Sequence, residues 1–181
     1  MHTTIRLVQS QEDLNSVLRL RYRVFTEEMG RTTLANREQQ FYTDEFDTER
    51  SLIFLAASEA NETIATLRLV PLLNGEIWKE PEYQLGTISS HLGLTGLHRG
   101  EIGLTDRGCI LTSARGGSLY YKLWQALLKE AAAASLRALV GVIDSTNSGL
   151  IAYHKRQHWL TYRSSVPFRD IIGNFICRRV Q

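Results

Sequence analysis

Residues 111–134 constrain the fold more than any other stretch. They read as the end of a strand, followed by a glycine pair and an amphipathic helix. The sequence of this unit is LTSARGGSLYYKLWQALLKEAAAA. In the second half, apolar side chains recur at helical spacing, which is typical of core packing: Tyr120, Leu123, Trp124, Leu127, Leu128 and Ala131. The next run, LRALVGVID, is almost continuously apolar, as expected of a central strand covered on both faces. A chain with this unit at its centre is predicted to have a layered α/β core.

The remaining periodic segments complete that picture. Ser10 with Asp13 predicts the start of a helix that runs through residues 13–29, and a second short helix is predicted over residues 147–157. Alternating or β-branched runs predict further strands at residues 3–9, 51–57, 63–71, 100–111, 158–165 and 170–180. The runs at 51–57 and 63–71 are joined by a short polar segment, so together they predict a β-hairpin. We therefore predict one α/β (α+β) domain over residues 1–181, with a mixed, mostly antiparallel sheet of about seven strands flanked by helices.

Composition narrows the function classes. The net charge of +2 is too small to indicate nucleic-acid binding, although it suits an anionic ligand or partner. No apolar run approaches the roughly 20 residues that a membrane-spanning helix needs, and the N-terminus has no signal-like apolar region, so we expect a cytoplasmic protein. Cys109 and Cys177 are expected to be buried thiols. No metal site is predicted, because the histidines lack ligand spacing: His2, His91, His98, His154 and His158.

One residue on the apolar face of the first predicted helix is charged. Arg21 lies on the apolar stripe that also carries Val17, Val24 and Phe25. An unpaired guanidinium is very costly to bury, so Arg21 is predicted to have a carboxylate partner.

The glycine pair suggests an anion site. The first turn of a helix has backbone N–H groups without internal partners, and Gly116 and Gly117 would let a phosphate approach them. The alternative is a tight strand-to-helix turn that binds nothing.

The order of elements, with a glycine turn opening a long helix after a central strand, resembles the GNAT acyltransferase superfamily. The resemblance implies a V-shaped split between the central strands that holds a pantetheine arm. It also implies that Arg115, Gly116, Gly117 and Ser118 hold the donor phosphate, with Asn147 on the cofactor side and Tyr153 as the acid that protonates the leaving thiolate. The glycine loop departs from the family pattern, and the spacing from Asn147 to Tyr153 is one residue shorter than is common. A weakened phosphate clamp suits a carrier-protein donor.

The N-terminal half resembles one GNAT branch, the acyl-homoserine lactone synthases and long-chain N-acyl amino acid synthases. The resemblance rests on LRYRVFTEEMG, DEFD, TLRLVP and GEIGL, which place five residues in that branch's charge network and substrate pocket: Arg21, Phe25, Asp44, Asp47 and Arg68. Arg31 stands where the lactone synthases have tryptophan, and Gly103-Leu104 where they have Ser-Arg. Both departures argue against lactone formation and leave N-acylation of another amine open.

Glu101 is given two alternative roles. The resemblance places it as the base that takes a proton from the attacking amine, directly or through water, because an ammonium must lose a proton before it attacks. Alternatively, Glu101 is an ion-pair partner of Arg68 or Arg21. The charge network as a whole either borders the acyl site or only ties the first helix and the following loop to the sheet.

The long segment from Leu72 to Gly100 has weak periodicity, and connections of this length are usually lids or binding loops. Its apolar residues either line an acyl tunnel or form ordinary core: Ile77, Trp78, Tyr83, Leu85, Ile88, Leu92, Leu94 and Leu97.

Together these features predict an N-acyltransferase without a permanently bound cofactor. Its co-substrate would be an acyl-phosphopantetheine thioester, carried by acyl carrier protein as a transient partner or by coenzyme A. The acyl group, expected to be long, would pass to the amine of an amino acid or similar small molecule by direct attack, without a covalent acyl-enzyme. The alternatives are an acetyl-CoA-dependent N-acetyltransferase and a non-catalytic module that senses acyl-CoA or binds a partner.

Overall fold

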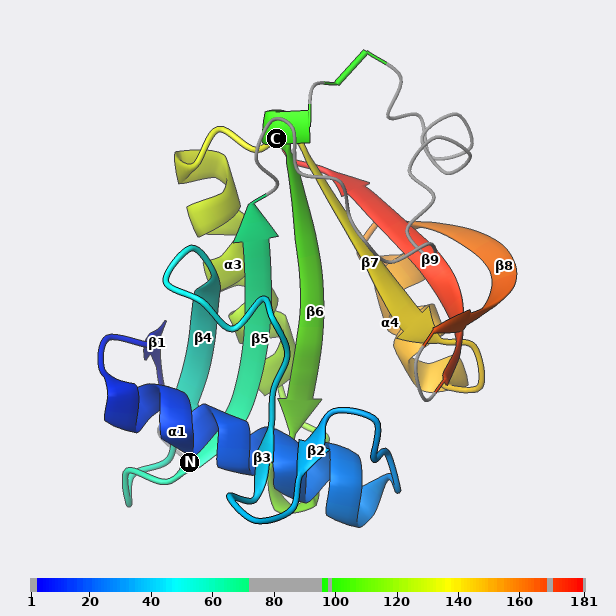
Figure 1. Ribbon diagram of the computed structural model, residues 1–181. Coiled ribbons are helices and arrows are strands. Elements are labelled where there is room, and N and C mark those ends of the chain that lie inside the picture. Colours follow the sequence, from blue (N-terminus) through cyan, green and yellow to red (C-terminus); the bar gives the residue numbers. More distant parts are fainter. Residues whose placement is uncertain (1–2, 72–95, 98, 169–170, 181) are drawn as a thin grey trace. The chain divides into compact units, whose positions relative to one another are not determined.

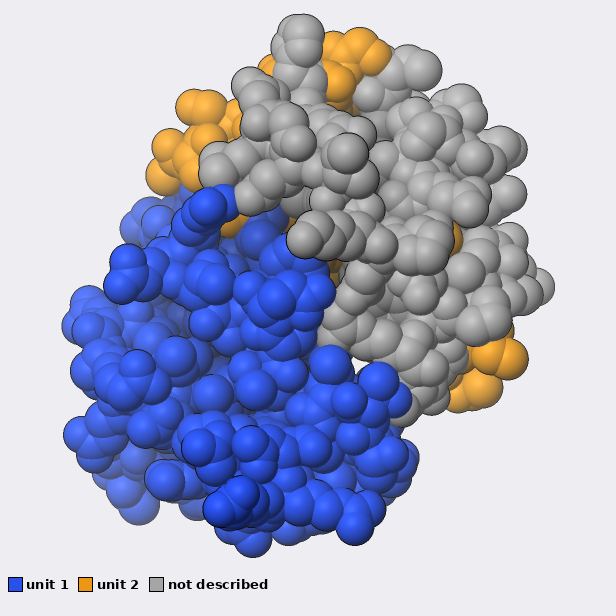
Figure 2. Space-filling model, in the orientation of Figure 1, with its two compact units in different colours: residues 1–70, 106–130 blue, residues 71–105, 131–181 orange. Residues whose placement is uncertain are grey.

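The computed structural model describes residues 3–71, 96–97, 99–168 and 171–180, and the chain divides into two compact units (Figures 1 and 2). Unit 1 comprises Met1–Val70 and Asp106–Glu130, and unit 2 comprises Pro71–Thr105 and Ala131–Gln181. Each unit is described by itself below. The expectation of a single domain over residues 1–181 stays a prediction.

Unit 1 contains the N-terminal elements and the parts of the central strand and long helix that belong to it. In chain order these are β1 (Thr4–Leu7), α1 (Gln11–Arg21), η1 (Tyr22–Glu28), β2 (Ala35–Asn36), β3 (Phe41–Tyr42), β4 (Leu52–Ala57), β5 (Thr63–Pro71), the second half of β6 (Ile102–Ile110), η4 (Thr112–Ala114) and most of α3 (Leu119–Ala133). β4 and β5 form the predicted antiparallel hairpin. The two-residue strands β2 and β3 pair in a separate small sheet, which the sequence patterns did not predict.

Helix α1 begins as predicted. The Ser10 hydroxyl accepts a hydrogen bond from the backbone N–H of Asp13 at 3.1 Å, which satisfies one free donor of the first turn. Asp13 also pairs with Arg6 of β1, and the hydrogen bond to Arg6 lowers the pKa of Asp13 to about 2. The helical run continues beyond Arg21, but it widens into the π-helical segment η1 over Tyr22–Glu28. Such segments are rare and are frequently found at functional sites.

Two helices of unit 1 cover opposite faces of the β4–β5 hairpin (Figure 1). Val17 of α1 packs on Ile53 and Leu55 of β4, whose cross-strand partners on β5 are Arg68 and Thr66. On the other face, Leu67 of β5 lies close to Gly108 of β6 and Tyr120 of α3. Arg68 and Thr66 therefore point toward the α1 side, where a polar group needs a partner.

Unit 2 contains the C-terminal strands. They are the first part of β6, then β7 (Ala138–Asp144), α4 (Ser148–Arg156), β8 (Leu160–Phe168) and β9 (Ile171–Arg179), and η3 (Arg99–Glu101) precedes β6. β6 and β7 pair in parallel over Ile102–Leu104 and are still close at Thr105 and Gly141, where a Cβ on Gly141 would lie 2.6 Å from the Thr105 carbonyl oxygen. The expected split between the central strands concerns the boundary of the two units and stays a prediction.

The strands are hydrogen-bonded in the order β1-β4-β5-β6-β7-β9-β8. Besides the parallel β6–β7 pair, β9 pairs antiparallel with β7 and with β8, and β1 pairs antiparallel with β4. The predicted mixed α/β architecture with seven mostly antiparallel strands is confirmed. Cys109 and Cys177 are free and buried, as expected. Among the described helices, none is long and apolar enough to cross a membrane.

Candidate active site

The buried arginine of α1 has the carboxylate partner that the sequence requires. Arg21 Nη1 donates to Asp47 Oδ1 at 2.7 Å, and the two side chains are 0% and 3% exposed. Within the described part of the chain, Arg21 Nε and Nη2 are also buried but have no hydrogen-bond partner. Arg21 therefore enters the network with donor capacity to spare.

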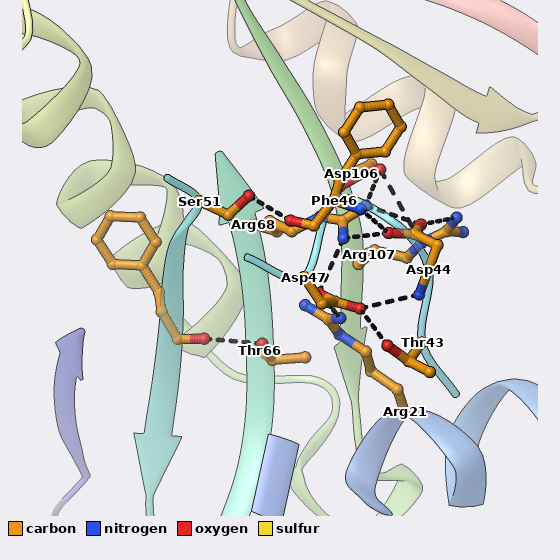
Figure 3. Close-up of polar contacts among 11 residues, drawn as sticks. Arg21, Thr43, Asp44, Phe46, Asp47, Ser51, Thr66, Arg68, Asp106 and Arg107 are labelled. Atoms are coloured by element: carbon orange, nitrogen blue, oxygen red, sulfur yellow. Dashed lines mark hydrogen bonds and ion pairs between the residues drawn. The ribbon is translucent and has the colours of Figure 1, made fainter. Parts of the chain in front are cut away.

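Arg68 is the centre of the network (Figure 3). Its Nε and Nη2 donate to the two oxygens of Asp106 at 2.8 and 2.7 Å. Nη1 donates to Asp44 and Asp47 at 2.6 and 2.8 Å, and Nη2 also donates to Asp44 at 3.0 Å. All five N–H donors of this buried guanidinium are thus used by three aspartates.

The segment DEFD after β3 is folded by its own side chains. Asp44 accepts from the backbone N–H of Phe46, and Asp47 accepts from the backbone N–H of Asp44 and the hydroxyl of Thr43. These short-range bonds position both carboxylates independently of the arginines. This explains why two acids three residues apart can meet one guanidinium.

Two members of the network, Asp106 and Arg107, were not predicted. Arg107 donates from Nε and Nη2 to Asp44 Oδ2, at 3.0 and 2.5 Å. Its φ of 54° is in the left-handed region, which a non-glycine residue adopts rarely and at a cost of about 1–3 kcal/mol. The sequence feature that could have indicated these two residues is a charged Asp-Arg pair in the middle of a mostly apolar strand.

The network of three arginines and three aspartates is balanced in charge: Arg21, Arg68, Arg107, Asp44, Asp47 and Asp106. Burial alone would raise the pKa of Asp44, but the ion pairs with Arg68 and Arg107 outweigh it and lower that pKa. Burial opposes ionisation of Asp47 in the same way, and Arg21 and Arg68 lower its pKa. Both carboxylates therefore stay charged at neutral pH.

Phe25, predicted in the same pocket, lies beside the network. Its ring packs on Tyr42 with centroids 5.0 Å apart, and the Arg31 guanidinium lies 5.4 Å from the Phe25 centroid. Arg107 lies 5.6 Å from the centroid of the Tyr42 ring. Arg31, which stands at the position of the branch's tryptophan, thus stacks on the predicted pocket phenylalanine.

Of the two alternative roles given to Glu101, an ion pair with Arg68 or Arg21 is not recorded among the described residues. The five donors of Arg68 are all taken by aspartates, and the partner recorded for Arg21 is Asp47. In unit 2, Glu101 ends the short helix η3 rather than lying in the strand, and its carboxylate accepts from Arg137 Nη1 at 3.1 Å. The alternative role of Glu101 as a base stays a prediction.

The glycine turn before α3 is open to solvent. Arg115, Gly116, Gly117 and Ser118 are all exposed, and Gly116 has a φ of 89°. No hydrogen bond to another described residue is recorded for the amides of residues 116–118, and nothing lies within 4 Å of a Cβ placed on either glycine. The Arg115 guanidinium donates to the Ile110 carbonyl and, at 2.5 Å, to Glu28. The turn therefore offers free amides, while Arg115 is held by a carboxylate of this chain.

The predicted residues of α4 have visible structural roles. Asn147 caps the helix, its Oδ1 accepting from the Leu150 N–H at 2.9 Å. The Tyr153 hydroxyl is buried, and its ring packs edge-on against the buried His154. Their roles toward a cofactor stay predictions.

Several expectations fall on residues outside those described. These are the apolar residues Ile77, Trp78, Tyr83, Leu85, Ile88, Leu92 and Leu94, together with His2, His91 and His98. Leu97 is described and is half-buried. In the described ranges, no group of three or more His, Cys, Asp or Glu side chains could hold a metal ion.

Comparisons with known proteins agree with this architecture. The model of the acetyltransferase (GNAT) domain family matches residues 20–125. A curated protein of Rhodobacter capsulatus named L-ornithine N(alpha)-acyltransferase is 28% identical over 173 residues, which is 90% of this chain and 64% of that protein. This chain therefore spans less than two thirds of that relative's length.

Solved structures support the fold at low sequence identity. The CoA-dependent acyl-homoserine lactone synthase BjaI, solved with SAM and isopentyl-CoA, has a TM-score of 0.71 and 15% identity, covering 99% of this chain and 84% of that one. An acetyltransferase of the GNAT family from Staphylococcus aureus has a TM-score of 0.69 and 9% identity, covering 99% and 100%. Both likenesses concern the fold.

Proposed function

The chain belongs to the acetyltransferase (GNAT) domain family, and from this premise we propose that it is an N-acyltransferase that acylates the amine of an amino acid or similar small molecule. The observation that carries the proposal is the match along 90% of this chain to a protein named L-ornithine N(alpha)-acyltransferase. The proposed donor is an acyl-phosphopantetheine thioester with a long acyl chain, delivered by acyl carrier protein or by coenzyme A.

The open turn before α3 supports a donor site. The free amides of Gly116, Gly117 and Ser118 stand at the N-terminal end of a 15-residue helix, where backbone N–H groups and the helix dipole favour an anion. In this proposal they hold the phosphate of the pantetheine arm. Arg115 would contribute by leaving Glu28 for the phosphate.

The chemical step is a direct displacement. The acceptor nitrogen gives up a proton to Glu101, directly or through water, and its lone pair attacks the thioester carbonyl. The C–N bond forms as the C–S bond breaks, and the Tyr153 hydroxyl supplies a proton to the leaving thiolate. A free cysteine nucleophile is not needed, and burial raises the pKa of the Cys109 thiol to about 12, so that this thiol is unreactive.

Thiol release tests the proposal. Palmitoyl-CoA, acetyl-CoA and a palmitoylated acyl carrier protein are each offered with a panel of amines that begins with L-ornithine. Release with the palmitoyl donors and an amino acid is the expected result. Release with acetyl-CoA alone would favour the acetyltransferase alternative, and no release with any pair would contradict the enzymatic role.

A single substitution probes the donor site. Gly117→Ala adds a methyl group into open space, so the fold should be unaffected, but the methyl should obstruct a phosphate at the amides. We expect KM for the donor to rise at least about tenfold, the equivalent of about 1.4 kcal/mol, with KM for the amine unchanged. Gln125→Ala, on the exposed face of the same helix, is the matched control. An unchanged donor KM would remove the turn from the donor site.

A further inference from the structure

Asp106 and Arg107 are neighbours in a strand, yet both side chains reach the same cluster (Figure 3). Side chains of consecutive strand residues normally point to opposite faces. Here Asp106 pairs with Arg68, and Arg107 pairs with Asp44, which itself binds Arg68. The left-handed φ of 54° at Arg107 makes this possible. The strand thus presents a negative and a positive group side by side on one face.

These two residues form the accessible edge of the network. Asp106 and Arg107 are each 10% exposed, whereas the side chains of Asp44 and Arg68 are 0% exposed. Each Asp106 oxygen accepts one bond from Arg68, which leaves acceptor capacity on both. No hydrogen bond to a described residue is recorded for Arg107 Nη1. The pair can therefore bind a further molecule without breaking the network.

Both groups are held in place before any ligand arrives. Arg68 fixes the Asp106 carboxylate by two parallel bonds, and Asp44 fixes one edge of the Arg107 guanidinium while the Tyr42 ring lies beside it. Preorganised groups lose little conformational entropy on binding, so they favour recognition.

The charge balance restricts what can bind. The six residues already neutralise one another, so a lone anion or a lone cation would leave an uncompensated charge in a largely buried site. A ligand that carries both charges on adjacent atoms keeps the balance. An α-amino acid is such a molecule, since its ammonium and carboxylate are attached to the same carbon.

We propose that Asp106 binds the ammonium group, and Arg107 the carboxylate group, of a zwitterionic amino acid that serves as the acyl acceptor. This assignment rests on the proposed function and concerns binding of the acceptor before the ammonium loses its proton. It identifies the acceptor class as free α-amino acids, and it excludes amines without a carboxylate and amino acids whose carboxylate is esterified.

The first test uses the intact protein and a ligand series. Binding of L-ornithine, its methyl ester and 1,4-diaminobutane is measured by titration calorimetry without a donor, and thiol release is measured with each amine and palmitoyl-CoA. We expect the free acid to bind at least about tenfold more tightly than either analogue, as loss of one charge-assisted interaction implies. Equal affinity for acid and ester would overturn the proposal.

The second test uses variants. Arg107→Asn removes the guanidinium and keeps a residue that tolerates positive φ, and Asp106→Asn is nearly isosteric. We expect Arg107→Asn to abolish the preference for the acid over the ester, a change that a merely structural role would not produce. Asp106→Asn should weaken binding of the free acid at least about tenfold and leave that preference intact. Arg23→Gln, in an exposed ion pair of the same unit, is the control.

The outcomes separate this proposal from the proposed function. If the wild-type protein transfers acyl groups and both variants keep the wild-type KM and the acid preference, the acceptor site lies elsewhere and the enzymatic role stands. If no thiol is released but L-ornithine binds and Arg107→Asn abolishes that binding, the site stands and the enzymatic role fails.

Discussion

Replacing Arg68 with methionine tests whether the network stabilises the fold by pairing buried charges. The change keeps an unbranched side chain of similar length but removes five N–H donors, which contact three carboxylates at 2.6 to 3.0 Å. Arg21 and Arg107 would then face three aspartates, so one buried carboxylate charge would have no compensation. Breaking a buried ion pair in this way costs about 3–5 kcal/mol.

The same unit offers a matched comparison. Arg23 and Glu62 are 3.4 Å apart and more than half exposed, at 57% and 58%. An exposed pair of this kind contributes about 0–1 kcal/mol, so Arg23→Met should cost no more than that. The difference between the two arginine-to-methionine substitutions therefore isolates the effect of burial.

Urea unfolding at pH 7, followed by far-ultraviolet circular dichroism, measures both free energies of unfolding. The double variant Arg68→Met/Asp44→Asn adds a sharper test, because it restores the balance with two arginines and two aspartates. We expect it to be at least about 1 kcal/mol more stable than the sum of the single effects predicts. Equal costs for Arg68→Met and Arg23→Met, or strict additivity in the double variant, would refute the charge-pairing argument.

Three further predictions concern stability. Burial lowers the pKa of His154 from 6.5 to about 4, so the unfolded chain takes up the proton first as the pH falls. The free energy of unfolding should therefore drop by about 3 kcal/mol between pH 7 and pH 4. His154→Phe should remove this dependence of the unfolding free energy on pH, measured by urea unfolding, whereas substitution of an exposed histidine, His158→Asn, should not. Gly141→Ala should lower the melting temperature in calorimetry, because its Cβ would lie 2.6 Å from a backbone oxygen. Ser10→Ala should cost about 1 kcal/mol in urea unfolding through loss of the helix cap.

The elements that the sequence predicted correctly are those specified locally. The Ser10 cap and the hairpin of β4 and β5 depend on neighbouring residues and on alternation, which can be seen without tertiary structure. The partner of Arg21 could also be anticipated, since a buried guanidinium needs a carboxylate whatever the fold. The identity of that partner among the acids of the chain came only from the resemblance.

The sequence did not predict the contacts of the network that depend on a single backbone angle. One of the two roles considered for Glu101 was an ion pair with Arg68 or Arg21, whereas the recorded partners of Arg68 include Asp106, which was not predicted. An Asp-Arg pair in a regular strand would point its side chains to opposite faces, so only the positive φ at Arg107 brings both to Arg68 and Asp44. Nothing local in the sequence specifies that angle. The widening of the first helix into η1 after Arg21 has no local signature either.

The electrostatics of the network also limit where a base can be. A general base works best when its pKa is near the operating pH. The arginines hold the pKa values of Asp44 and Asp47 below their usual range, so both carboxylates are poor proton acceptors at neutral pH. Their bonds to guanidinium, hydroxyl and amide donors further reduce their capacity to take a proton. The buried aspartates are therefore suited to holding Arg68 and the edge residues Asp106 and Arg107 in place, and deprotonation of the amine has to come from a group outside them, which is the part proposed for Glu101.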